Sequence, residues 1–239
     1  MKKTISIIIS IAMCAMLASC GGVKNGVSDT EQPTLMDTMS LEEKVGQILF
    51  VRCVEDEQTD DLMSIKPGGI LMFGRDFEGL TKDEVKEKIQ SYQDKSDIPL
   101  IIGADEEGGT VVRVSSNPNL APEKFKSPQE IYNEGGMDAV VENATEKSEL
   151  LLSLGVNMNL APVADVSTNP SDYMYDRSLG QNAEATADFV SKTVTAMNNA
   201  GIMSVLKHFP GYGGVGGDSH QGTVYDDKTA ESIRENDLL

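Results

Sequence analysis

The fold of this chain is constrained most by the way short apolar runs alternate with segments of helical spacing. Apolar runs of strand length occupy residues 48–51, 69–73, 98–103, 156–160 and 202–206. Helical patterns occupy residues 81–93, 131–151 and 183–199, and a last helix is expected to begin near Lys228. Strands that are apolar along their length, each followed by a helix, predict a parallel sheet buried on both faces and therefore an α/β fold.

Two local signals mark helix boundaries. The run Ser40-Leu41-Glu42-Glu43 has the pattern of a capping box, which predicts that the folded part opens with a short helix near Ser40. The pair Gly135-Gly136 predicts an interruption of the helix over residues 131–151, because glycine is a weak helix former.

Two α/β architectures have this alternation, an open doubly wound sheet and a closed (β/α)8 TIM barrel. Polar side chains stand at or just after the strands, at Arg52, Arg75, Asp105, Asp165 and Lys207. A barrel gathers ligand groups from the ends of several strands onto one face, and no Gly-x-Gly-x-x-Gly motif follows the first strand. The barrel is therefore favoured, and we expect it to be incomplete in this chain, with about five of its eight β/α units present.

Residues 1–19 have the pattern of a bacterial lipoprotein signal peptide. Lys2 and Lys3 precede an apolar run, which ends in Leu17-Ala18-Ser19-Cys20. Such a signal is cut before the cysteine, so we predict lipidation of Cys20 and no transmembrane helix. The alternative is an ordinary secretory signal with an incidental cysteine. The prediction is an exported protein that faces away from the cytoplasm and contacts the bacterial cell membrane only through the lipid on Cys20.

Beyond the leader, residues 20–38 are small or polar without an apolar period, which predicts a flexible tether, and residues 39–239 are expected to form the folded domain. Cys53 then has no disulfide partner, and we predict a buried strand residue rather than a nucleophile. The formal net charge of −18 argues against a nucleic acid or an anionic membrane surface as a partner. A neutral or cationic ligand fits this charge better.

The best candidate for chemistry is the glycine-rich loop of residues 207–220, which contains both histidines of the chain. Histidine both gives and takes a proton near neutrality, and Asp218 stands two residues before His220, where it can orient the imidazole. A metal pair is the alternative, but the chain has no third histidine and no cysteine nearby, so acid/base use is favoured and neither a metal nor a cofactor is expected. Lys207 and His208 directly follow a strand, which favours a place at the rim of a site over a buried structural pair.

Three further polar residues are candidates for binding. Asp105 ends the third strand and can accept bonds from two sugar hydroxyls, with Arg113 eight residues on. An acidic surface turn explains Asp105-Glu106-Glu107 equally well. Arg177 lies in the long loop after the fourth strand, where a surface pair with its neighbour Asp176 is slightly favoured over a ligand contact.

Taken together, these motifs resemble the N-terminal domain of family 3 glycoside hydrolases, in the β-N-acetylglucosaminidase branch. The resemblance covers about Ser40 to the last residue. It rests on Lys-His-Phe-Pro-Gly followed by Asp-Ser-His, supported in order by Asp-x-Glu-Gly-Gly, Ala-Pro-Val-x-Asp and Arg-Ser-x-Gly.

The resemblance implies a (β/α)8 barrel that removes terminal β-linked N-acetylglucosamine with retention, through a covalent glycosyl-aspartate, from cell-wall muropeptides or chitin-type sugars. It implies that His220 is the general acid and base and that Asp218 holds it. It also implies that the sugar's hydroxyls and N-acetyl group are bound by Asp105, Arg113, Arg177, Lys207 and His208.

The chain departs from the family pattern at three points. Tyr212 stands where the family usually has a second histidine, and Thr110 replaces a common arginine; no role is expected for either. The family's nucleophilic aspartate is expected beyond Leu239, so this chain alone is expected to be inactive. Two alternatives remain open, a sugar-binding lipoprotein fragment without catalysis and a phosphorylase of the same glycosides.

Overall fold

The computed structural model describes residues 34–238. The chain divides into two compact parts, Met1–Met39 and Ser40–Leu239, which are considered separately. In the first part, the short helix α2 (Leu35–Thr38) lies within the range predicted to be a tether. The predicted signal peptide and Cys20 lie outside the described residues. No helix among residues 34–238 is long and apolar enough to cross a membrane.

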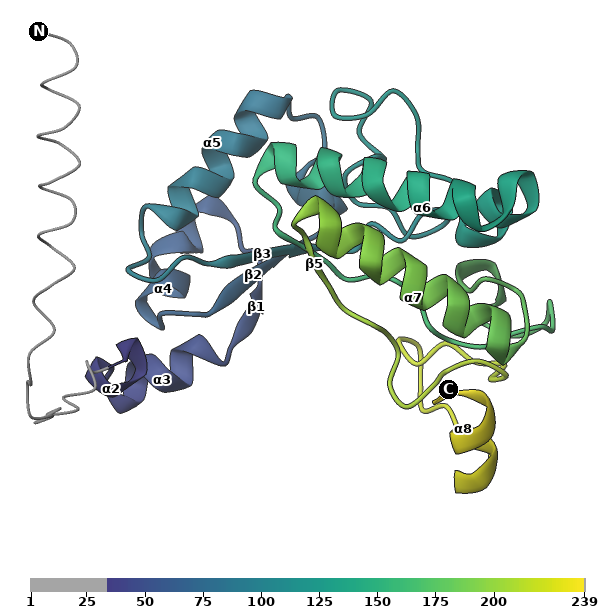
Figure 1. Ribbon diagram of the computed structural model, residues 1–239. Coiled ribbons are helices and arrows are strands. Elements are labelled where there is room, and N and C mark those ends of the chain that lie inside the picture. The colour runs from purple at the N-terminus through teal and green to yellow at the C-terminus, as the bar shows by residue number, and fades with distance from the viewer. Residues whose placement is uncertain (1–33, 239) are drawn as a thin grey trace, which may run out of the picture. The chain divides into compact units, whose positions relative to one another are not determined.

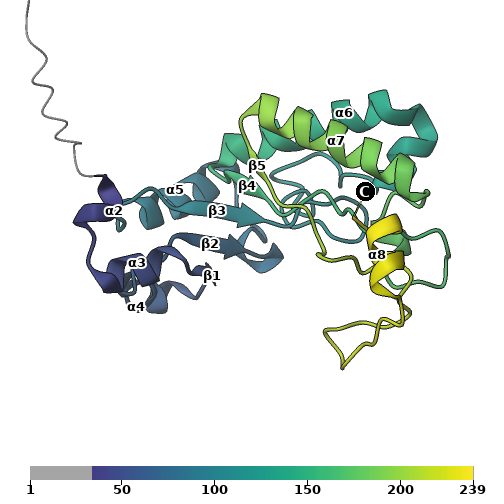
Figure 2. The ribbon, with the colours of Figure 1, turned by 60° about the horizontal axis from the view of Figure 1, so that its bottom comes forward.

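The second part is built on a parallel sheet of five strands (Figures 1 and 2), namely β1 (Phe50–Arg52), β2 (Gly69–Met72), β3 (Ile101–Ala104), β4 (Met158–Asn159) and β5 (Met203–Ser204). Each strand pairs with the next strand along the chain, so the spatial order is the chain order. A doubly wound sheet reverses its order at a switch point, whereas a (β/α)8 barrel keeps chain order around its wall. The α/β prediction and the choice of the barrel are confirmed for the strands described.

Helices cover one side of this sheet (Figure 1). The three long ones are α5 (Lys82–Gln93), α6 (Pro128–Leu154) and α7 (Ala183–Ala200), and two short ones are α3 (Leu41–Gln47) and α4 (Thr59–Ser64). The short helix α8 (Ala230–Asn236) lies apart from the sheet (Figures 1 and 2). The capping box at Ser40 is confirmed, because its hydroxyl accepts from the Glu43 N–H at 3.2 Å and the Glu43 carboxylate accepts from the Ser40 N–H at 2.8 Å. The interruption of α6 is also confirmed, since Gly136 has φ 65° and ψ −155°.

The core lies between the sheet and the long helices. Ile70, Met72 and Ile102 of the strands are fully buried and belong to one cluster with Val85 of α5 and Leu154 of α6. Burial of each such side chain contributes about 1.5–3 kcal/mol, so this layer fixes where the strand ends lie.

Cys53 is buried directly after β1, and its Sγ lies 3.2 Å from the hydroxyl of Tyr92. Burial raises the pKa of the Cys53 thiol, which disfavours the nucleophilic thiolate.

The observed strands differ from the predicted ones mainly at their starts. Ile48 and Leu49 were expected in the first strand, but Ile48 caps α3 and β1 begins at Phe50. The third strand was expected from Ile98, but the ladder with β2 begins at Ile101. Helix α4 was not predicted, because six residues give too little periodicity.

Candidate active site

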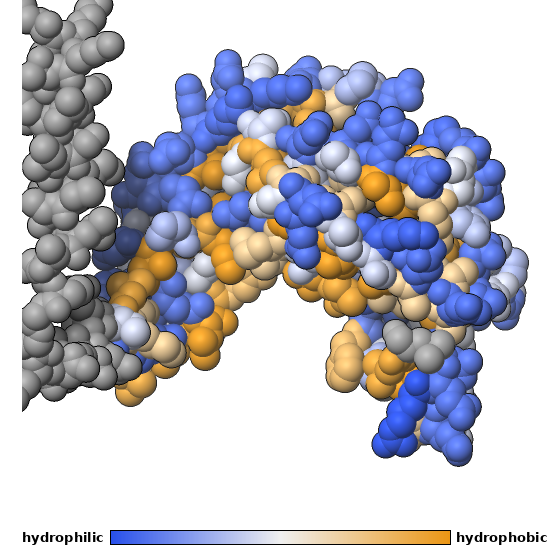
Figure 3. Space-filling view, in the orientation of Figure 1, coloured by the Kyte–Doolittle hydropathy of each residue, from blue (hydrophilic) through white to orange (hydrophobic). Residues whose placement is uncertain are grey.

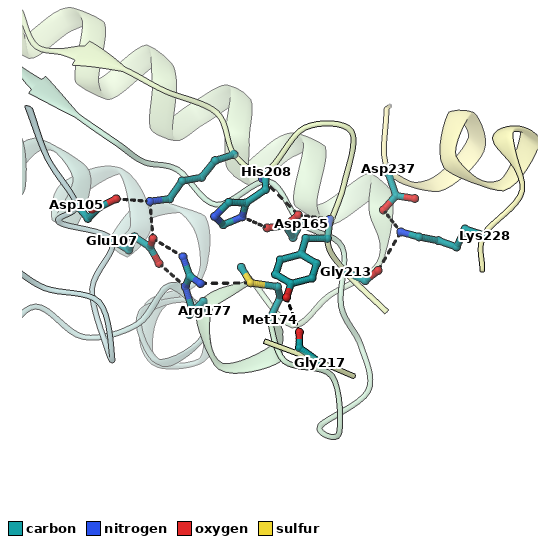
Figure 4. Close-up of polar contacts among 12 residues, drawn as sticks. Asp105, Glu107, Asp165, Met174, Arg177, His208, Gly213, Gly217, Lys228 and Asp237 are labelled. Carbon is teal, nitrogen blue, oxygen red and sulfur yellow. Dashed lines mark hydrogen bonds and ion pairs between the residues drawn. The ribbon is translucent and has the colours of Figure 1, made fainter. Parts of the chain in front are cut away.

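Polar side chains that follow three different strands converge at the carboxyl edge of the sheet (Figure 4). Asp105 comes directly after β3, and Lys207 comes three residues after β5. The Lys207 Nζ lies 2.6 Å from the Asp105 Oδ1, although the two residues are 102 positions apart in the chain. Both side chains are largely buried. The prediction of a rim position for Lys207 is therefore confirmed only in part, because Lys207 follows a strand end but its side chain points to buried carboxylates.

Glu107 joins this pair to Arg177, and together Asp105, Glu107, Arg177 and Lys207 form what we call the buried charge cluster. The Glu107 carboxylate lies 2.6 Å from the Lys207 Nζ. It also accepts two hydrogen bonds from Arg177, from Nε at 2.9 Å and from Nη2 at 2.8 Å. Its side chain has no exposed surface, so two cations are needed to offset the cost of burying it.

The expectation of a surface pair between Arg177 and Asp176 is wrong. Arg177 is only 13% exposed, and its guanidinium faces Glu107 instead. Burial by itself lowers the pKa of Arg177, but the hydrogen bonds and the charge of Glu107 outweigh burial, so that its pKa is raised. Glu107 is not predicted by the sequence pattern, because three acids in a row give no sign of which one is buried.

Glu106, unlike its neighbours Asp105 and Glu107, binds backbone N–H groups and no cation within residues 34–238. Its buried carboxylate accepts backbone N–H bonds from Arg113 at 2.8 Å, Val114 at 2.7 Å and Ser115 at 3.2 Å. These bonds fix the turn that carries Arg113, whose Nη2 lies 3.7 Å from the Asp105 Oδ2. The acidic surface turn considered as an alternative is therefore excluded for this run, because Glu106 and Glu107 are both buried.

His208 is held by Asp165, a residue that the sequence placed after the fourth strand without a role. The His208 Nδ1 lies 2.7 Å from the Asp165 Oδ2. The same carboxylate accepts the backbone N–H of Tyr212 at 2.6 Å. Asp165 therefore fixes both the imidazole of His208 and the start of the turn that follows it.

The Asp218–His220 pair, which we call the dyad, is formed as predicted. The His220 Nδ1 lies 2.8 Å from the Asp218 Oδ1, which also accepts the His220 backbone N–H at 3.0 Å. These hydrogen bonds, from the backbone first and then the ring, lower the pKa of Asp218 to about 2. The imidazole is 79% exposed, and among the described residues it makes no hydrogen bond to the buried charge cluster.

Six of the seven predicted site residues thus lie in three contacting groups. The first is Asp105, Lys207 and Arg177, joined through Glu107; the second is His208 with Asp165; the third is the dyad. The seventh residue, Arg113, lies 3.7 Å from Asp105 of the first group. Within residues 34–238, no three His, Cys, Asp or Glu side chains are grouped as ligands for a metal ion. An imidazole bonded to a carboxylate is able to transfer protons, and the charged groups after the strands are able to hydrogen-bond to a polar ligand.

The chain is similar to curated proteins that are named beta-hexosaminidases. The chain is 29% identical over 185 residues to the "Beta-hexosaminidase" of Haemophilus influenzae, covering 77% of this chain and 52% of that protein. It is 27% identical over 241 residues to "Beta-hexosaminidase LpqI" of Mycobacterium tuberculosis, covering 93% of this chain and 61% of that protein. The chain therefore spans about half the length of the curated relatives it matches.

Solved structures of family 3 glycoside hydrolases are also similar to this chain. A family 3 β-N-acetylglucosaminidase from Paenibacillus superposes with a TM-score of 0.75 at 28% identity, covering 84% of this chain and 39% of that one. The sequence model described as "Glycosyl hydrolase family 3 N terminal domain" matches residues 40–239. The chain belongs to glycoside hydrolase family 3, and these residues are its N-terminal domain.

Proposed function

We propose that the protein is a retaining exo-acting β-N-acetylhexosaminidase in which His220, oriented by Asp218, is the general acid and base. The observation that carries this proposal is the hydrogen bond between the two side chains on an exposed loop beside a set of buried binding groups. The names of the relatives, beta-hexosaminidase and β-N-acetylglucosaminidase, support the choice of substrate.

The geometry of the dyad suits a two-step reaction. With a pKa of about 2, Asp218 is ionised at neutral pH, so it favours the proton on the Nδ1 of His220 and leaves Nε2 for the substrate. In the first step Nε2–H protonates the glycosidic oxygen while the bond from C1 to that oxygen breaks and the nucleophile bonds to C1. In the second step Nε2 takes a proton from the water that attacks C1, and the bond to the nucleophile breaks. We assign the nucleophile to no residue of this chain.

Asp105, Arg113, Arg177, Lys207 and His208 are proposed to bind the sugar. Asp105 accepts hydrogen bonds from hydroxyl groups, while Lys207, Arg113 and Arg177 donate to hydroxyl or N-acetyl oxygens. The ion pairs hold these side chains in place before substrate arrives, so little is lost in ordering them on binding.

We also propose a natural substrate and a location for the enzyme. Terminal N-acetylglucosamine of cell-wall muropeptides or of chitin-type sugars fits the family. A lipid on Cys20 would hold the enzyme on the outer side of the cell membrane, next to such polymers. Mass spectrometry of the membrane-bound protein tests this location directly, because the lipid adds a defined mass to Cys20.

The activity is tested with the full-length protein that contains these residues and the p-nitrophenyl β-N-acetylglucosaminide. Replacing His220 by Ala should lower kcat by about 10²–10⁴-fold, which is the usual size of a general acid/base contribution. Thr223→Ala is the matched control, because Thr223 is exposed in the same loop. Absence of p-nitrophenol release by the unaltered protein contradicts the proposed activity, and full activity in His220→Ala contradicts the role of His220. Dependence of release on added phosphate identifies a phosphorylase instead.

A further inference from the structure

The hydroxyl of Tyr212 contacts the backbone on both sides of Asp218. It donates a hydrogen bond to the carbonyl oxygen of Gly217, and it accepts the N–H of Ser219 at 2.9 Å. Asp218 therefore sits between two residues that are bound to the same oxygen atom (Figure 4 shows the contact with Gly217). Neither the proton-transfer role nor the sugar-binding role proposed above involves this tyrosine.

The other end of Tyr212 is attached to a buried residue of the site. Its backbone N–H binds the carboxylate of Asp165, the residue that also holds His208. Its ring lies 6.0 Å from the His208 ring in an edge-on arrangement and 5.7 Å from the ring of Tyr173. One side chain thus connects the support of His208 to the support of the dyad.

Few other contacts among the described residues attach the dyad to the domain. The side chain of Tyr173 hydrogen-bonds to Asp218, and the Tyr173 backbone N–H binds the carbonyl oxygen of Val215 at 3.0 Å, three residues before Asp218. The backbone N–H of His220, the backbone N–H of Gln221 and the side-chain NH2 of Gln221 all donate to Asp218, so these bonds shape the turn without attaching it to the domain. Between the buried Val215 and Asp218, Gly216 and Gly217 give the backbone conformational freedom. His220 is mostly exposed, so packing does not restrain it. An anchor of the backbone on both sides of Asp218 restrains this stretch further, which favours one geometry of the dyad toward the substrate.

We infer that Tyr212 is a positioning residue whose hydroxyl holds the Asp218–His220 dyad in the geometry needed for proton transfer. The role of the dyad in proton transfer rests on the proposed function, whereas the attachment of the turn by the hydroxyl does not. Tyr212→Phe removes one oxygen atom and keeps the ring contacts with Tyr173 and His208. Tyr225→Phe is the matched control, because Tyr225 is 80% exposed in the same loop region and its hydroxyl has no hydrogen bond among the described residues.

The first measurement is hydrogen exchange of the backbone N–H of Ser219 in the full-length protein. Tyr212→Phe should speed this exchange by about tenfold or more, because the N–H loses its acceptor. Tyr225→Phe should leave it unchanged. Equal exchange in the unaltered protein and in Tyr212→Phe, with the same Tm, overturns the inference. This measurement needs no catalytic activity, so it stands even when the proposed function fails.

The second measurement compares two glycosides with different leaving groups. A p-nitrophenyl group leaves with little help from an acid, whereas an alkyl alcohol leaves only when it is protonated. Tyr212→Phe should therefore lower kcat on the methyl β-N-acetylglucosaminide at least about tenfold more than kcat on the p-nitrophenyl compound. Equal losses on both compounds indicate general loosening of the site and overturn the positioning role. No activity of the unaltered protein on either compound contradicts the proposed function instead.

Discussion

At the scale of single residues, the run Asp105-Glu106-Glu107 shows how adjacent acids acquire different tasks. Asp105 contacts Lys207, while Glu106 fixes a backbone turn and Glu107 pairs with two cations. The difference comes from what each carboxylate meets once the chain is folded. A carboxylate without exposed surface requires compensating charge or hydrogen bonds, and both glutamates obtain them.

Glu107→Gln is expected to destabilise the domain strongly. The change leaves Arg177 and Lys207 without their shared counter-charge in a buried place, which costs about 3–5 kcal/mol in comparable sites. The same change at Glu134, which pairs with Lys126 at 2.7 Å on the surface, should cost less than about 1 kcal/mol. Urea unfolding of both variants measures the difference. Equal losses would show that the pairs of Glu107 contribute no more than a surface pair.

At the scale of elements, α6 is attached to the loop after β3 by Lys147. Its ammonium donates to the backbone carbonyl of Glu107 at 2.8 Å. Burial lowers the pKa of Lys147 to about 8, and the nearby charges of Glu106 and Glu107 oppose this only in part. At neutral pH the Lys147 ammonium is therefore still charged, although its removal from water disfavours the charged form.

The stability of the domain is expected to depend on pH through Lys147. Its pKa is lower in the folded state than in the unfolded state, so the unfolded state binds more protons between about pH 8 and 10.4. The contribution of Lys147 is least favourable below pH 8 and rises with pH across that range. The unfolding free energy of the unaltered protein minus that of Lys147→Met should therefore rise by about 2–3 kcal/mol from pH 7 to pH 10. A difference that does not change with pH contradicts this expectation.

At the scale of the whole molecule, the side of the sheet opposite the long helices is hollow and apolar. Figure 3 shows apolar residues gathered on that concave side. Phe209 and Leu206, which follow β5, are 86% and 52% exposed, and Phe50 of β1 is 40% exposed. Within residues 34–238, β1 and β5 are the two outer strands of the sheet, and each has an edge without a partner strand. Such edges and apolar surfaces favour association.

A protein limited to the described residues is therefore expected to self-associate as its concentration rises. Replacing Leu206 and Phe209 by Ser should reduce this association, because it removes apolar surface next to the open edge at β5. Tyr225→Ser is the control, since Tyr225 is equally exposed but does not follow a strand. Sedimentation velocity measures the degree of association, and a monomer at every concentration would show that these surfaces do not cause self-association.

The sequence by itself determined the order of strands and helices, because apolar periodicity and capping are local properties. The capping box at Ser40 and the break at Gly136 were predicted from a few adjacent residues. The pairing of Asp218 with His220 was predicted for the same reason, since the two residues are neighbours in the chain. The starts of β1 and β3 were not predicted, because a strand begins where its backbone first pairs with the neighbouring strand, and that pairing is not a local property.

Only the tertiary structure decided which polar residues meet across long distances in the chain. Glu107 and Arg177 are 70 positions apart, and Asp165 and His208 are 43 apart, so no local pattern joins them. Tyr212 was a departure from the family pattern without an expected role, yet the folded loop places its hydroxyl between Gly217 and Ser219. The physical reason is that burial and hydrogen bonding depend on all the segments that meet at a point, whereas a sequence pattern reports only one segment at a time.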